Sequence, residues 1–185
     1  DEGDPDRNRF DIRRARLGLD LRLNDRFRFK ALYEFEGAGS RRLLDACLDV
    51  RTSPLISFRI GQFKKPFGLE ESTRDKHIFF AERSMAHWLG PYRDLGLMAY
   101  GSLLNDRVWY GLGIFNGDGL DDTSGGDVDA PEFSGRVAVS LFGGDRPSPA
   151  GDLQIGGSYR YARIDRNNVD FEVMTAGLTT FLDVA

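Results

Sequence analysis

The sequence predicts an all-β protein, an antiparallel up-and-down transmembrane β-barrel, and three observations predict it. Apolar and charged residues alternate with period two along most of the chain, as in strands with one apolar and one polar face. These segments are about ten residues long, the length of a tilted strand that crosses a bilayer. Short turns alternate with longer loops, an asymmetry typical of outer-membrane barrels.

The composition fits this class. The 185 residues suit one domain, taken here as residues 1–185 of a partial barrel with a disordered start at 1–9. No stretch approaches the roughly 20 apolar residues of a membrane helix. A content of 29% charged residues is compatible with a membrane barrel, because only alternate residues face lipid. The net charge of −4 argues against nucleic-acid binding.

The first two strands show the clearest alternation. Between Ala15 and Leu23 the odd positions are apolar and the even positions are mostly charged. Asn24 and Asp25 are tight-turn residues, and the pattern resumes from Phe27 onwards. These segments predict a β-hairpin.

Later segments extend the pattern to eight strands and the beginning of a ninth. Turns are expected at 52–54, 105–106 and 143–151, and loops at 37–42, 116–131 and 163–169. The further strands are expected at 44–51, 56–61, 95–103, 108–114, 133–141, 153–161 and 171–182.

A long connection interrupts this series. Alternation stops at Pro66, and the next alternating strand begins only after residue 92. The segment between them is charged and partly aromatic, with no residues suited to a tight hairpin. Connections of this length without structure of their own are uncommon unless they are functional. We expect residues 66–92 to fold into the mouth of the barrel.

The polar face of the predicted strands is rich in cations. A soluble sandwich, in which two sheets bury their apolar faces against each other, remains an alternative. In a barrel, fixed cations around a narrow aqueous lumen raise the local anion concentration. The charged residues on this face are Arg14, Arg16, Arg22, Arg26, Arg28, Lys30, Arg51, Arg59, Arg107, Arg136 and Arg160, against Asp20, Glu34, Glu36, Asp45, Asp49, Asp94 and Glu132.

Several stretches resemble a known family over nearly the whole chain. Residues 10–19 (FDIRRARLGL) and the central segment 60–73 (IGQFKKPFGLEEST) with 82–84 (ERS) resemble the phosphate-selective porin O/P family. Residues 93–97 (RDLGL) and 113–119 (GIFNGDG) match it as well. The resemblance implies a homotrimeric, sixteen-stranded outer-membrane barrel of a Gram-negative bacterium, of which this chain is about the N-terminal half. Its implied partners are membrane lipid, lipopolysaccharide and small anions.

The resemblance also implies site residues. Arg13 and Arg14 match strand arginines near the pore, Arg83 matches the arginine of the constriction, and Lys76 matches a nearby loop lysine. Together with Arg16 and Arg59, which the alternation places on the polar face, they form the predicted anion path. Glu71 departs from the family, since the strongly phosphate-selective members have a lysine there, and a carboxylate opposes anion binding.

Other functions find little support in the residues. His77 and His87 have no partner histidine or cysteine nearby in sequence, so neither a metal site nor a cofactor is expected. Ser84 lies near His87, but nothing orients the pair for catalysis, and we expect no enzymatic activity. The principal alternative to a pore is a small structural barrel that fills its own interior with side chains.

Overall fold

A computed structural model describes residues 12, 15–36, 42–69, 73, 92–117, 119, 131–142, 153–163, 171–174 and 180–184. The elements within this part of the chain are β-strands. No helix among these residues is long and apolar enough to cross a membrane. The predicted disordered start at 1–9 and most of the 66–92 connection lie outside the described residues.

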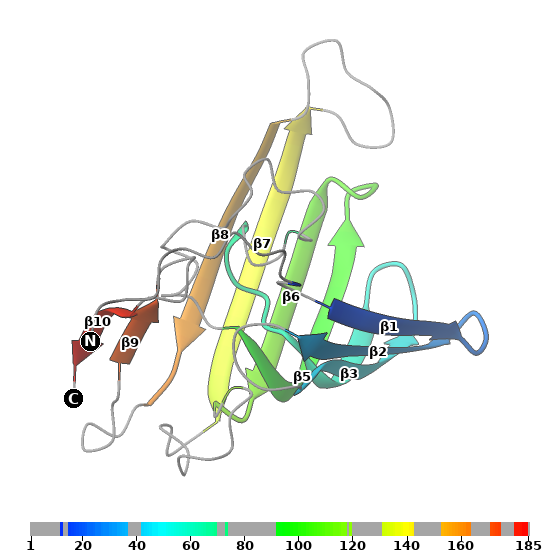
Figure 1. Ribbon diagram of the computed structural model, residues 1–185. Helices are drawn as coiled ribbons and strands as arrows, with labels where there is room; N and C mark the ends of the chain where they lie inside the picture. The colour runs from blue at the N-terminus through cyan, green and yellow to red at the C-terminus, as the bar shows by residue number, and fades with distance from the viewer. Residues whose placement is uncertain are drawn as a thin grey trace, which may run out of the picture.

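Eight strands form one antiparallel sheet in sequence order (Figure 1). This confirms the predicted all-β, up-and-down architecture. The two edge strands of this sheet, the first and the eighth, do not pair with one another, so the described sheet is open. The strands are β1 (Ala15–Arg22), β2 (Phe27–Glu36), β3 (Arg42–Arg51), β4 (Ser57–Lys64), β5 (Arg93–Leu103), β6 (Val108–Phe115), β7 (Glu132–Phe142) and β8 (Leu153–Tyr161).

The end of the chain differs from the expected ninth strand. Instead of one strand over 171–182, two short strands occur, β9 (Phe171–Met174) and β10 (Thr180–Val184). They pair with each other in a separate two-stranded sheet (Figure 1). Periodicity alone does not show where a chain reverses, so it joined two short strands into one.

The turns at Asn24 and at 104–107 form at the predicted positions, and the turn expected at 143–151 lies outside the described residues. The side-chain Oδ1 of Asn24 accepts hydrogen bonds from the backbone N–H groups of Arg26 and Phe27, both at 2.9 Å. This is the local closure that asparagine provides in turns. The short turn between β5 and β6 contains three residues with positive φ values, namely Leu104 at 55°, Asn105 at 56° and Asp106 at 62°. Asparagine and aspartate tolerate this left-handed conformation better than most residues.

This sheet exposes its apolar side chains and buries many of its polar ones, which is the reverse of a soluble protein. Leucines on one side of the sheet are exposed, including Leu17 at 66% and Leu112 at 58%. On the other side Asp49 is 2% exposed and Ser134 is 3% exposed. The strand register keeps each set on one side: Leu97 lies opposite Ile114 on the apolar side, while Ser134 lies opposite Gly113 on the polar side. We call these sides the outer face and the inner face.

A bulge corrects one predicted position. The alternation of Leu44, Ala46, Leu48 and Val50 with polar residues predicts that Leu44 lies on the apolar outer face, but it is completely buried. The register between β2 and β3 shifts between Leu32 and Tyr33, so that Tyr33 pairs with Leu43 and Leu44 is the extra residue. A bulge of this kind reorients the side chain it adds, because that residue has no partner in the ladder.

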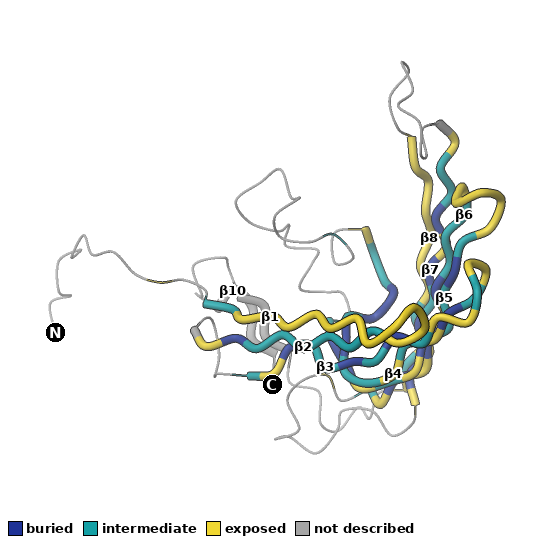
Figure 2. Tube along the Cα trace, turned by 90° about the vertical axis from the view of Figure 1, so that its right-hand side faces the viewer, coloured by how far each residue is buried: buried dark blue, intermediate teal, exposed yellow. Residues whose placement is uncertain are grey.

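The sheet bends strongly between β1–β4 and β5–β8 (Figure 2). Inner-face side chains from strands that are not neighbours meet within the bend. Arg93 at the start of β5 donates a 2.6 Å hydrogen bond to Asp45 on β3, and the Tyr100 hydroxyl on β5 donates a 3.1 Å bond to Asp49 on β3. The inner face is therefore concave, and its polar groups are buried against one another.

Candidate pore-lining face

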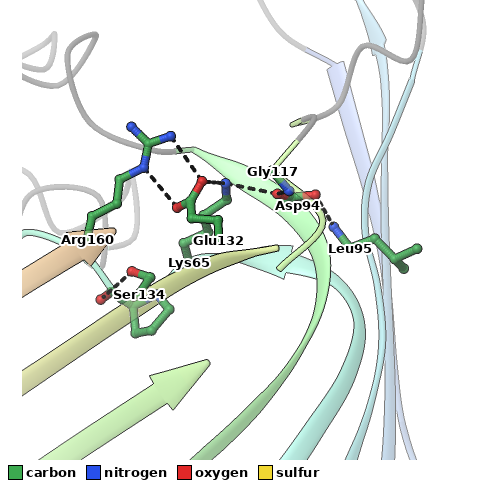
Figure 3. A network of polar contacts seen from close by, with 8 residues as sticks. Lys65, Asp94, Leu95, Gly117, Glu132, Ser134 and Arg160 are labelled. Carbon is green, nitrogen blue, oxygen red and sulfur yellow. Dashed lines mark hydrogen bonds and ion pairs between the residues drawn. The ribbon is translucent and has the colours of Figure 1, made fainter. Parts of the chain in front are cut away.

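The root of the long connection is bound to the inner face by an ionic network (Figure 3). The Lys65 ammonium, just after β4, lies 2.9 Å from Asp94 on β5 and 2.8 Å from Glu132 on β7. Glu132 also lies 2.9 Å from Arg160 on β8. Lys65, Asp94 and Glu132 are almost completely buried. Burying charged groups costs hydration free energy, and the attraction between them offsets this cost only when their contacts are short and well oriented. The buried groups of this network therefore depend on one another.

Backbone groups complete the network (Figure 3). Asp94 accepts 2.7 Å hydrogen bonds from the N–H groups of Gly117 and Leu95. The Ser134 hydroxyl donates to the carbonyl oxygen of Pro66 at 3.3 Å, and the N–H of Gly68 donates to the Ser158 hydroxyl at 3.0 Å. The described start of the connection thus crosses from β4 over the inner face as far as β8.

A buried apolar cluster that includes Phe63 and Phe115 packs against this network. Phe63 and Phe115 pack edge to face with their ring centroids 5.5 Å apart, and the Lys65 ammonium lies 5.7 Å from the Phe115 ring. The Phe115 ring rests on Gly96 and Gly113, where any added Cβ would collide with it. Glycine at these positions lets an aromatic ring lie close against the sheet.

Further ion pairs line the inner face of β1–β4. The Arg59 guanidinium binds both carboxylate oxygens of Asp49, at 2.6 and 3.0 Å, the two-pronged geometry that favours arginine over lysine. Arg16 binds Glu34 at 2.6 Å. Arg28 binds both oxygens of Asp20, the Nε bond being 2.6 Å. Of the eleven cations that the alternation predicts on this face, four are therefore paired with carboxylates in the described part of the chain, namely Arg16, Arg28, Arg59 and Arg160.

A cavity of about 640 Å³ lies between this ion-paired wall and the root of the connection. Strands β1 to β6 contribute to its lining, and so do Lys65, Pro66 and Thr73, which lie between β4 and β5. Six cations line the cavity, namely Arg16, Lys30, Arg59, Lys64, Lys65 and Arg93, against the two carboxylates Asp20 and Asp45. Since Arg16, Arg59, Lys65 and Arg93 are each bound to a carboxylate, the charge that can attract anions to this cavity is smaller than the count of lining cations.

The structure places two of the six predicted site residues. Arg16 on β1 and Arg59 on β4 both line this cavity. Arg13, Arg14, Lys76 and Arg83 lie outside the described residues, so their roles stay predictions. The departure at Glu71 and the histidines His77 and His87 also fall outside that part of the chain.

Sequence reasoning did not single out Lys65 or Lys30 as site residues. Lys65 follows a strand and precedes Pro66, and no sequence pattern predicts that a lysine at a strand end will have two carboxylate partners on other strands. Arg136 was placed on the polar face, and it is 7% exposed with no ion-pair partner in the described ranges. Among these residues no group of His, Cys, Asp or Glu side chains is arranged to hold a metal ion.

Comparison with known proteins agrees with this architecture. A search of curated proteins gives no match. The family model described as phosphate-selective porin O and P matches residues 1–180, which is almost the entire sequence. A match of this extent, together with the single up-and-down sheet and its inverted faces, establishes the relationship. The chain belongs to the phosphate-selective porin O and P family.

Proposed function

We propose that this protein forms a diffusion channel for small anions, such as phosphate or polyphosphate, in the outer membrane of Gram-negative bacteria. The observation that supports this most strongly is the inverted sheet, with exposed leucines outside and buried charged groups inside. Lipid accommodates an apolar outer band without cost, whereas an open sheet in water would expose it. Family membership supports the same location.

The inner face supports a conducting path. It carries a cavity whose lining includes six cations and two carboxylates, and the root of the long connection crosses it. Arg16 and Arg59 line this path on the strands, and we assign Arg13, Arg14, Lys76 and Arg83 to the same path because they match the family pattern. We extend the proposal to a homotrimer in contact with lipid and lipopolysaccharide, as the resemblance implies.

The rival function is a small structural barrel without a pore. An eight-stranded barrel would close by pairing its first strand with its last. In the described sheet β1 and β8 do not pair, which favours a larger barrel with room for a lumen. The channel is therefore the function that the geometry supports best, and catalysis has no comparable support.

Ion selectivity tests the proposal. We expect the whole protein, in a planar bilayer under a KCl gradient, to give an anion-selective reversal potential. Replacing the constriction arginine in Arg83→Ala should weaken that selectivity, because a cation at the narrowest point contributes most to the local anion concentration. The control is Arg107→Ala: the alternation predicts Arg107 on the polar face, but the structure places it, exposed, in the turn before β6, where its charge is screened by salt.

Two outcomes would contradict the proposal. A cation-selective potential would mean that carboxylates such as Glu71 outweigh the arginines. Folded protein that inserts into the bilayer without conducting would favour the structural barrel.

A further inference from the structure

The cavity beside the root of the long connection is lined by a cation, Lys30, for which the described residues show no ion-pair partner. Lys30 lies on the inner face of β2, opposite Asp20 on β1 and Cys47 on β3, and it lines the cavity. Its side chain is half-buried. Within the described ranges no carboxylate forms an ion pair with it.

The carboxylates around Lys30 are already bound to arginines. Asp20, directly opposite, is held by Arg28. On β3 the two diagonal neighbours are also engaged, Asp45 by Arg93 and Asp49 by Arg59. Four residues further along β2, Glu34 is bound to Arg16.

These nine side chains comprise five cations and four carboxylates. Since each carboxylate is bound to one guanidinium, the excess of one positive charge resides at Lys30. A guanidinium that donates hydrogen bonds to both oxygens of a carboxylate has few N–H groups left to bind a permeating anion. A lysine ammonium has three donors on a flexible stem, and without a protein partner all three can bind a solute.

We propose that Lys30 binds the permeating anion in this cavity, and that the arginines around it hold the wall in shape by neutralising its carboxylates. The proposal deepens the channel function and rests on it. The ligand class is a small hydrated oxyanion or halide. A single ammonium provides charge and hydrogen bonds, but it lacks the planar donor arrangement by which a guanidinium selects an anion by its shape. Lys30 is then a determinant of anion selectivity. It could not be distinguished in the sequence from the many arginines on the same face.

The test compares permeability ratios in planar bilayers under a KCl gradient, with chloride as the probe anion. We expect Lys30→Gln to lower the chloride-to-potassium ratio about three- to fivefold, since one unit charge at contact distance in water changes the local anion concentration by about that factor. Lys30→Arg should retain most of the selectivity. The matched control is Asp25→Asn combined with Arg26→Gln, which removes a carboxylate and a cation from the exposed turn between β1 and β2 without changing the net charge.

A second measurement works within a single open channel, so it does not depend on how well each variant folds. The buried Cys47 is replaced by alanine, and Lys30→Cys is labelled during recording. A reagent that attaches a quaternary ammonium should raise the anion preference, and one that attaches a sulfonate should lower it.

The outcomes separate the two levels of the proposal. If the wild-type protein is anion-selective and neither Lys30→Gln nor labelling at position 30 changes the ratio, the role of Lys30 is overturned while the channel function stands. If the wild-type protein shows no anion preference, the proposed anion channel itself fails. A control pair that lowers selectivity as much as Lys30→Gln would also overturn the assignment, because balanced charges would then matter equally.

Discussion

Replacing Lys65 with methionine is expected to lower the free energy of unfolding by about 3–5 kcal/mol. The substitution keeps the length and apolar stem of the side chain but removes the ammonium that joins Asp94 to Glu132. Both carboxylates are buried, and removing one partner of a buried ion pair leaves its charge uncompensated. Urea titration of the protein folded into lipid vesicles, followed by tryptophan fluorescence, measures the change.

The control for this variant is Arg107→Met, which removes a cation from an exposed turn. It should change stability by no more than about 0.5 kcal/mol. We also expect Lys65→Met channels to show larger open-channel current noise, because the root of the long connection is no longer held to β5 and β7. A loss below about 1 kcal/mol with unchanged noise would mean that the network in Figure 3 does not hold the connection.

Replacing Leu97 with arginine is expected to destabilise the protein in a bilayer by about 2–4 kcal/mol. Leu97 lies on the outer face in the middle of β5, between Ile60 and Ile114 on the neighbouring strands. A guanidinium there would face the hydrocarbon core, where it has no water and no partner. The same vesicle-based urea titration provides the measurement.

The matched comparison is Leu103→Arg, at a residue on the same strand as Leu97 but nearer the expected membrane surface. Leu103 ends β5 next to the 104–107 turn and is also exposed on the outer face. Near the membrane interface an arginine costs only about 0–1 kcal/mol, so Leu103→Arg should be tolerated. If the two variants were equally destabilised, the outer face would not span a bilayer in the proposed direction, and a soluble sandwich would regain support.

The strands and their faces could be predicted from the sequence because the period-two pattern is a direct consequence of strand geometry. The hairpin around Asn24 and the outward leucines of β1 and β5 follow from local residues alone. The family relationship was equally visible, since the central stretch around Pro66 is specific to it. These features depend on neighbours in sequence and on one face of one strand.

The ion-pair network could not be predicted in the same way. The partners of Lys65 lie on β5 and β7, and the bulge that buries Leu44 depends on how β2 and β3 match in register. Counting charges on the inner face predicted a broadly cationic lining, but it could not show which arginines are bound to carboxylates. The distinct position of Lys30 appears only when each neighbouring carboxylate has been assigned a partner.

Spin labelling in lipid vesicles tests the central claim, that the outer face contacts lipid and the inner face contacts water. Single cysteines at Leu97 on the outer face and Gln154 on the inner face, in a Cys47→Ala background, each carry a nitroxide. We predict that the label at 97 collides mainly with oxygen, which partitions into lipid, and that the label at 154 collides mainly with a water-soluble nickel chelate. Equal access of the nickel chelate to both positions would contradict the inverted barrel wall and the channel it implies.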